Sequence, residues 1–205
     1  MLTLHMIRHA LAVGAAGPPP EPDGQSAAVA LILVPGSAAG LDVLFIRRAV
    51  RAGDPWSGQV GLPGGRRAAA DRDLVVTAVR ETQEEVAVNL QHAERLGTLA
   101  DLPPRTPVLP PIVVRPFVFA LTARPSLVPS VEVQSAFWVS LAALRAPGVR
   151  CDITLPLQGG SRTGPAYVVG DDTIWGMTER IVTSFFEAIG TDIGTRYLTQ
   201  KDILA

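Results

Sequence analysis

Two neighbouring stretches of the chain, GQVGLPGG at Gly58–Gly65 and RETQEE at Arg80–Glu85, carry its strongest structural signal. The first stretch ends in a Pro-Gly-Gly turn, and apolar side chains recur at helical spacing from Asp71 to Val88. The order predicts a strand, a glycine-rich loop and a helix. We expect Asp71 to be the N-cap of this helix and Asp73 to complement its positive N-terminus.

The predicted helix separates its apolar and acidic side chains. At about 100° per residue, one stripe is expected to face the core and consists of Val75, Val79, Thr82 and Val86. Three carboxylates share another, exposed side, and they belong to Glu81, Glu84 and Glu85. Such carboxylates repel one another unless a cation lies among them. Hard divalent cations are commonly shared between carboxylates and substrate phosphates, so this face predicts metal-assisted phosphate chemistry. The alternative is an ordinary solvated face on which Arg80 pairs with Glu84.

The rest of the chain predicts a mixed sheet flanked by helices. Short β-like runs lie at 27–34, 43–46, 112–121 and 136–139, and a second helical segment is expected over 173–189. Pro18–Asp23 has the composition of a stiff linker. We therefore expect an N-terminal appendage with its linker at residues 1–24 and one α/β domain at residues 25–205.

Composition excludes several classes of function. The chain has 205 residues, with 18 basic and 19 acidic ones, so no overall field would draw it to nucleic acid or to an anionic membrane. No apolar run approaches the roughly 20 residues of a membrane span. A single cysteine, Cys151, fits a reducing compartment, and we expect a cytoplasmic protein.

The constellation resembles the Nudix hydrolase box, Gly-x5-Glu-x7-Arg-Glu-U-x-Glu-Glu-x-Gly-U, in which U is apolar. The matching residues are Gly65, Arg80, Glu81, Glu84, Glu85 and Val88. Asp71 stands where the family usually has Glu, and one more residue separates it from Arg80. Thr82 and Ala87 replace the apolar residue and the final glycine. The resemblance implies an α/β/α sandwich with a mixed sheet.

The longer spacing is similar to that of the branch that includes the coenzyme A pyrophosphatases. Thr77-Ala78-Val79 before Arg80 fits that branch, as do Leu44, Arg48-Ala49 and Gly58-Gln59-Val60 upstream. Leu62 and Asp54 depart from its upstream signature. The resemblance implies hydrolysis of coenzyme A, or of its derivatives, to 3′,5′-ADP and 4′-phosphopantetheine.

The resemblance also implies roles for individual residues. Glu84 and Glu85 would bind Mg²⁺ or Mn²⁺, Glu81 would be a ligand or a general base, and Arg80 would orient Glu81. Glu132 is a candidate for a remote catalytic carboxylate.

Substrate-binding residues are expected just before the helix. Gly64 and Gly65 let the backbone bend close to the helix and its metal. Arg48 is the arginine that we expect to bind substrate phosphate.

Two classes of function stay open at this point. The first is a hydrolase of a nucleotide-type small molecule, with coenzyme A first and NADH or ADP-ribose as alternatives. The second is a Nudix-like module that senses a nucleotide without turnover. The intact Glu81, Glu84 and Glu85 favour the enzyme, and a homodimer is possible by analogy alone.

Overall fold

The computed structural model describes residues 2–13, 25–36, 40–54, 56–103, 112–157 and 160–191. The helices in these residues are α1 (Leu4–Val13), α2 (Leu74–Val86), α3 (Leu141–Leu144) and α4 (Gly176–Ala188). The strands of the larger sheet are β1 (Ser26–Pro35), β2 (Leu41–Arg48), β3 (Val60–Gly61), β4 (Gly64–Arg66), β5 (Glu94–Thr98), β6 (Val113–Ala120) and β7 (Val133–Ser140). A smaller sheet contains β8 (Arg150–Leu157), β9 (Gly160–Val169) and β10 (Asp172–Trp175).

The larger sheet is mixed, which confirms the predicted α/β class. Its order is β3-β2-β1-β6-β5, with β4 paired to β1 and β7 paired to β2. The central strand β1 runs parallel to β6 and antiparallel to β2. Its apolar run from Ala27 to Val34 is buried almost throughout, as a strand between two helical layers requires.

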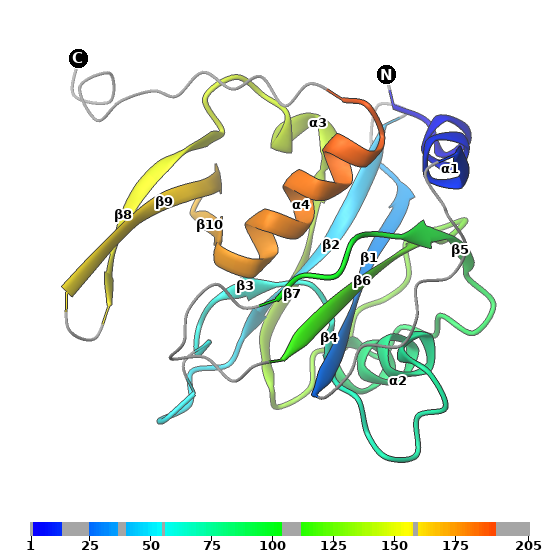
Figure 1. Cartoon of the computed structure of the whole chain (residues 1–205), viewed down its shortest axis with the longest axis horizontal. Helices are drawn as coiled ribbons and strands as arrows, with labels where there is room; N and C mark the ends of the chain where they lie inside the picture. Colours follow the sequence, from blue (N-terminus) through cyan, green and yellow to red (C-terminus); the bar gives the residue numbers. More distant parts are fainter. Residues whose placement is uncertain are drawn as a thin grey trace.

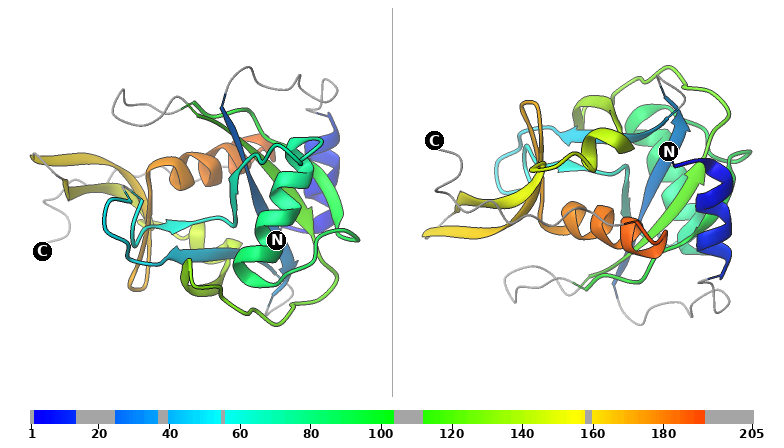
Figure 2. Two further views of the ribbon diagram at one scale, coloured as in Figure 1. Left: turned by 90° about the horizontal axis from the view of Figure 1, so that it is seen from below. Right: turned by 90° about the horizontal axis from the view of Figure 1, so that it is seen from above.

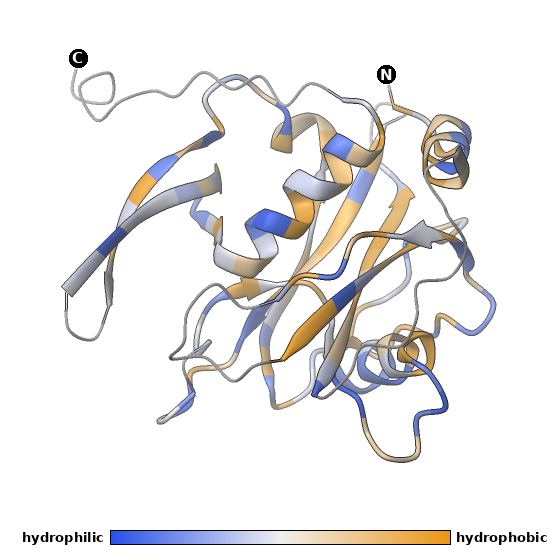
Figure 3. Ribbon diagram, viewed as in Figure 1, coloured by the Kyte–Doolittle hydropathy of each residue, from blue (hydrophilic) through white to orange (hydrophobic). Residues whose placement is uncertain are grey.

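Alternate residues of β1 enter hydrophobic clusters on the two faces of the sheet. Leu33 joins Phe185 of α4 and Ile7 of α1, whereas Ile32 joins Leu74 of α2. Figure 2 shows α2 and α4 on either side of β1, and Figure 3 shows the apolar residues concentrated on the central strands. The molecule is therefore the expected sandwich of helices around one sheet.

The helix α2 lies inside the predicted range of residues 71–88, but the predicted N-cap is wrong. The cap is Asp73, whose side chain accepts a hydrogen bond of 2.8 Å from the backbone N–H of Val76. Asp71 cannot take this place because its carboxylate is buried and bonded to Arg80. The negative charge at the helix start thus comes from the cap itself.

The prediction of which side of α2 is buried is right only in part. The buried residues are Leu74, Thr77, Ala78, Thr82, Glu85 and Val86. Val75 and Val79, expected in the centre of the core-facing stripe, are only partly buried and pack at the edge of the α2 cluster. Glu85, expected on the exposed face, is 4% exposed, because the backbone of β4 lies over it.

The predicted runs at 27–34, 43–46 and 136–139 form longer strands, and the run at 112–121 forms the slightly shorter β6. The three strands of the smaller sheet are not predicted, and β10 occupies the first residues of the helix expected over 173–189, so that α4 begins only at Gly176. Strands β8 and β9 form a hairpin that extends away from the body of the molecule (Figure 1). A buried ion pair holds its base on α4, since Glu179 accepts hydrogen bonds from Arg150 at 3.0 and 3.1 Å and from Thr183 at 2.8 Å.

The segment expected as an appendage begins with helix α1, which packs on β5. Its Ile7 and Leu11 are buried in the same cluster as α4. The predicted linker at Pro18–Asp23 lies outside the described residues. Among the described residues, no helix is both long enough and apolar enough to cross a membrane.

Candidate active site

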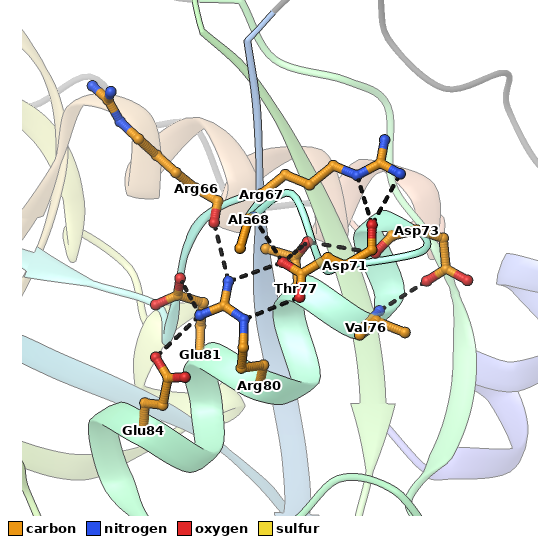
Figure 4. Close-up of polar contacts among 10 residues, drawn as sticks. All are labelled: Arg66, Arg67, Ala68, Asp71, Asp73, Val76, Thr77, Arg80, Glu81 and Glu84. Atoms are coloured by element: carbon orange, nitrogen blue, oxygen red, sulfur yellow. Dashed lines mark hydrogen bonds and ion pairs between the residues drawn. The ribbon is translucent and has the colours of Figure 1, made fainter.

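Asp71 and Arg80 form the polar centre that joins the glycine-rich loop to α2 (Figure 4). Arg80 donates to both oxygens of Asp71, at 3.1 Å from Nε and 2.9 Å from Nη2. The Asp71 carboxylate also accepts from the N–H of Ala68 and from the hydroxyl of Thr77, both at 2.9 Å. The hydrogen bonds from Arg80 lower the pKa of Asp71 to about 2, against the opposing effect of its burial. The pair is therefore ionised and fixes Arg80.

From this position Arg80 reaches two of the predicted carboxylates. Its Nη1 lies 2.9 Å from Glu81 Oε1 and 3.0 Å from Glu84 Oε2, and its Nη2 donates to the Arg66 carbonyl at 3.1 Å. The predicted contact of Arg80 with Glu81 is present. The predicted ion pair of Arg80 with Glu84 is also present. An ion pair on this face of the helix and a metal site formed by its carboxylates are therefore compatible with one another.

Gly65 allows the loop to lie directly against the Glu81 carboxylate. A Cβ atom at this glycine would stand 2.5 Å from Oε2 and 2.6 Å from Oε1 of Glu81. Gly65 has no left-handed backbone angle, so close approach rather than backbone strain requires the glycine here. The close approach of this loop to the helix, expected from the sequence, is seen.

Gly64 holds the third carboxylate. Its N–H donates to Glu85 Oε2 at 2.9 Å, and its own φ of 151° is one that side chains rarely adopt. Burial raises the pKa of Glu85 to about 7, although the hydrogen bond from Gly64 favours the ionised form. Burial also raises the pKa of Glu81. Neighbouring carboxylates also oppose ionisation, since the charge of Glu81 raises the pKa of Glu85 and the charge of Glu84 raises the pKa of Glu81.

These carboxylates fit a divalent cation. Glu81 is partly buried and Glu85 is almost fully buried, and burial raises the pKa of both carboxyl groups. A cation beside them would favour their ionised forms, and carboxylate oxygens are ligands that suit Mg²⁺ and Mn²⁺. Glu84 is 58% exposed and is turned toward Arg80. Within the described ranges, no three acidic, histidine or cysteine side chains are arranged to hold an ion by themselves. Water and substrate oxygens would complete the coordination, as is usual for Mg²⁺.

A second group of charged side chains lies at and just after the end of β2. Arg48 pairs with Asp54 at 2.9 Å, and its buried Nε has no hydrogen-bond partner. Arg51 pairs with Glu132 at 2.9 Å. The charge of Arg48 lowers the pKa of Glu85 and that of Glu132 raises it, so both are close enough to act on it.

Sequence reasoning missed two features of this region. The first is the burial of Asp71 beneath Arg80. Thr77 is the residue in the sequence that could have indicated it, because its hydroxyl donates a hydrogen bond to the Asp71 carboxylate. The second is the contact of Asp54 with Arg48, which gives a reason for the residue that departs from the related signature. Burial opposes the ionisation of Asp54, but hydrogen bonds from Arg48 and the Trp56 N–H outweigh it and lower its pKa.

A surface hollow of about 500 Å³ lies beside the loop. Its lining is mixed, with arginine and amide groups next to apolar atoms: Gln25, Ser26, Arg66, Arg67, Ala68, Ala69, Asp71 and Ile112. The guanidinium of Arg66 points away from the Asp71 cluster (Figure 4). The hollow shares Asp71 with the polar centre but does not include Glu81, Glu84 or Glu85, so it is a neighbour of the carboxylate site and not the site itself.

Known proteins resemble this chain over most of its length. A model of the NUDIX domain family matches residues 24–153. The mitochondrial coenzyme A diphosphatase NUDT8 of Mus musculus is 32% identical over 162 residues, which cover 77% of this chain and 74% of that protein. The human protein of the same name is 31% identical, with coverage of 77% and 67%.

Two further matches differ in extent. An uncharacterised protein of Schizosaccharomyces pombe is 41% identical over 110 residues, which cover 51% of this chain, but the match spans only 33% of that protein. The crystal structure of a MutT/nudix family protein from Enterococcus faecalis superposes with a TM-score of 0.58 at 21% identity, covering 87% of this chain and 67% of the other. At that identity the structural match shows the fold alone.

Proposed function

Since this chain belongs to the Nudix family, we propose that it is a metal-dependent pyrophosphohydrolase whose substrate is coenzyme A or one of its derivatives. The observation that carries the proposal is the convergence of Glu81 and Glu85 against the backbone of Gly65 and Gly64. Burial raises the pKa of both carboxylates, which is the electrostatic condition that a bound cation relieves. A solvated acidic face would not have this property.

We assign the metal to Glu85, with Glu81 and Glu84 as its neighbours. A bound Mg²⁺ or Mn²⁺ would neutralise charge on the diphosphate and lower the pKa of a coordinated water. Glu85 is kept in place by the Gly64 N–H, and Glu81 by Arg80. Glu84 joins the other two when its carboxylate leaves Arg80, and its exposure leaves room for that movement.

The reaction needs a proton acceptor and a group that holds the diphosphate. Water attacks one phosphorus atom, the bridging P–O bond breaks, and two phosphate monoesters leave. We assign Glu81 as the acceptor of the water proton, because Arg80 and the backbone of Gly65 fix its carboxylate in place. Glu132 is the second candidate for this role, since its charge acts on Glu85. Arg48, whose side chain is partly exposed and pairs with Asp54, binds the diphosphate.

The choice of coenzyme A rests on two supports. The two NUDT8 proteins carry coenzyme A diphosphatase in their names and match this chain at 31–32% identity over 77% of its length. The upstream residues Leu44, Arg48 and Gly58 to Val60 agree with the related signature. Of these, Arg48 is close enough to Glu85 for its charge to lower the pKa of that carboxyl group.

Product analysis tests the proposal. The protein is incubated with coenzyme A, NADH or ADP-ribose, each with Mg²⁺, Mn²⁺ or a chelator, and the products are identified by mass. We expect 3′,5′-ADP and 4′-phosphopantetheine from coenzyme A only when metal is present. Glu85→Gln should abolish turnover, whereas Glu187→Gln, an exposed carboxylate on α4, should not change it. Binding without cleavage of any substrate would support a nucleotide sensor instead.

A further inference from the structure

The surface hollow beside the glycine-rich loop has no part in the catalytic roles assigned above. Its volume of about 500 Å³ lies in the range of sites that bind small molecules, roughly 300–1,000 Å³. Asp71 belongs to its lining, whereas the three glutamates of α2 that we assign to catalysis do not. The hollow is therefore available to a part of the substrate that lies outside the metal site.

A single guanidinium group separates the hollow from the carboxylates. Arg80 Nη2 donates to the Arg66 carbonyl at 3.1 Å and to Asp71 Oδ2 at 2.9 Å, and both of these residues line the hollow. Arg80 Nη1 lies 2.9 Å from Glu81 Oε1 (Figure 4). A molecule whose diphosphate lies at Glu81 therefore has to extend past Arg80 to enter the hollow.

Arg66 supplies a positive charge to this lining. Its side chain is exposed, and among the described residues it makes no hydrogen bond and no ion pair. Its guanidinium points away from the Asp71 cluster (Figure 4). The neighbouring Arg67 instead holds the loop, because it donates to the Asp71 carbonyl at 3.1 and 3.2 Å and to the Arg72 carbonyl at 2.8 Å. Of these two arginines, Arg66 is the one that can bond a ligand without breaking the loop.

The backbone of Arg66 is fixed by the sheet. Arg66 pairs with Ala27 across β4 and β1, and the N–H of Arg67 donates to the Ser26 carbonyl at 3.0 Å. A binding group carried by a strand is positioned more precisely than one carried by a loop. A guanidinium placed in this way suits phosphate, because its N–H groups can bond two phosphate oxygens at once.

The acidic residue of the lining does not cancel the charge of Arg66. Both oxygens of Asp71 accept hydrogen bonds from Arg80, and the Ala68 N–H and the Thr77 hydroxyl also donate to this carboxylate. These bonds hold the negative charge inside the loop, where Asp71 is only 5% exposed. The hollow therefore suits an anionic group at Arg66.

The remaining lining is uncharged and of mixed polarity. Ile112, Ala68 and Ala69 provide apolar surface, whereas the Gln25 amide and the Ser26 hydroxyl can donate and accept hydrogen bonds. A nucleoside has the matching chemistry, because its base has apolar faces and a polar edge and its ribose carries hydroxyl groups. The lining thus suits a nucleoside that carries a phosphate group.

We propose that this hollow binds the nucleoside end of the substrate and that Arg66 bonds a phosphate group on its ribose, outside the diphosphate. Coenzyme A carries such a group, since the proposed hydrolysis releases 3′,5′-ADP. The inference rests on the proposed function and identifies the residue that distinguishes substrates with this third phosphate. In ADP-ribose both phosphates belong to the diphosphate, so Arg66 would stay in water.

Two substrates that differ only in the third phosphate test the inference. We would measure kcat and KM for coenzyme A and 3′-dephospho-coenzyme A with the unchanged protein, Arg66→Gln and Arg95→Gln. Arg95 is an exposed arginine on the edge strand β5. Loss of a charged hydrogen bond in Arg66→Gln should lower the ratio of the two kcat/KM values about 10-fold, through KM. Arg95→Gln should keep the ratio of the unchanged protein.

Binding of nucleotides gives a readout that does not need turnover. Calorimetry in the presence of a chelator would compare 3′,5′-ADP with 5′-AMP. The unchanged protein should bind 3′,5′-ADP about 10-fold more tightly, and Arg66→Gln should remove the difference. Ala69 lines the hollow, so Ala69→Trp should fill part of it and weaken the binding of both nucleotides.

The outcomes separate this inference from the proposed function. Hydrolysis of coenzyme A with an unchanged ratio in Arg66→Gln would overturn the inference and leave the proposed function standing. Absence of any turnover would refute the proposed function, and calorimetry would still decide the inference, since equal affinities for the two nucleotides would overturn it. Undiminished nucleotide binding by Ala69→Trp would place the nucleoside outside the hollow and contradict the inference.

Discussion

Replacement of Gly65 by alanine is the sharpest structural test of the carboxylate site. The added Cβ would lie 2.5 and 2.6 Å from the two Glu81 oxygens, whereas ordinary contact begins at 3.4 Å. The Glu81 carboxylate must therefore retreat by about 1 Å, and a misplacement of that size can lower a rate about 100-fold. We expect kcat of Gly65→Ala to fall by about that factor.

The fold should survive the same change. The atoms in the way belong to the far end of a side chain, and Gly65 has no left-handed backbone angle that alanine would strain. The free energy of unfolding should change by less than about 1 kcal/mol. Gly61→Ala, in the neighbouring strand β3, is the matched control, because its nearest neighbour, Ile46 Cγ1, is 4.0 Å from the added atom.

The assay is steady-state coenzyme A hydrolysis at a series of Mg²⁺ concentrations, with urea unfolding of both variants. If Glu81 acts as the base, kcat falls at every metal concentration. If it acts as a ligand, high Mg²⁺ restores part of the rate. Normal kcat in Gly65→Ala, with Gly61→Ala also normal, would refute the positioning of Glu81 by the loop.

Three further changes test the electrostatics and the framework. Asp71 has a pKa of about 2 in the folded protein, below the ordinary 3.8, so its stabilising effect is complete above pH 4 and is lost as the pH falls toward 2. Asp71→Asn should therefore lower the free energy of unfolding at pH 7 by about 2 kcal/mol. Urea unfolding at several pH values should also show a weaker loss of stability in acid for this variant than for the unchanged protein. Glu179→Gln leaves Arg150 with a weakened buried partner and should cost about 3 kcal/mol in urea unfolding without changing KM. Asp73→Ala removes the α2 cap and should cost about 1 kcal/mol in the same assay.

Local spacing predicted the part of the fold that positions the site. The order of strand, glycine-rich loop and α2 is encoded within consecutive residues, and so is the approach of Gly65 to the helix. The buried run of β1 likewise identifies a central strand, because both of its faces need apolar cover.

Tertiary contacts account for the errors. A helical wheel places Glu85 among the exposed charges, but the Gly64 N–H reaches it from another strand and the sheet covers it. Asp71 is a residue type that often caps helices and precedes the helix, but its carboxylate is hydrogen-bonded to Arg80 and does not cap α2. Neither partner can be identified from periodicity alone, since both depend on how β4 lies across α2.

The hairpin of β8 and β9 escaped prediction for a different reason. Gly160, Gly164 and Pro165 interrupt the alternation that marks a strand. The two strands are stabilised instead by backbone pairing across the hairpin and by the hydrogen bond of Arg150 to Glu179 on α4, neither of which is visible in the sequence pattern.

Crystallographic location of Mn²⁺ by its anomalous scattering tests the central claim most directly. Crystals grown with Mn²⁺ should show a peak within coordination distance of the Glu81 and Glu85 carboxylates, and the peak should vanish in Glu85→Gln. An ion bound elsewhere, or a peak unchanged in that variant, would contradict the assignment of these carboxylates to the metal.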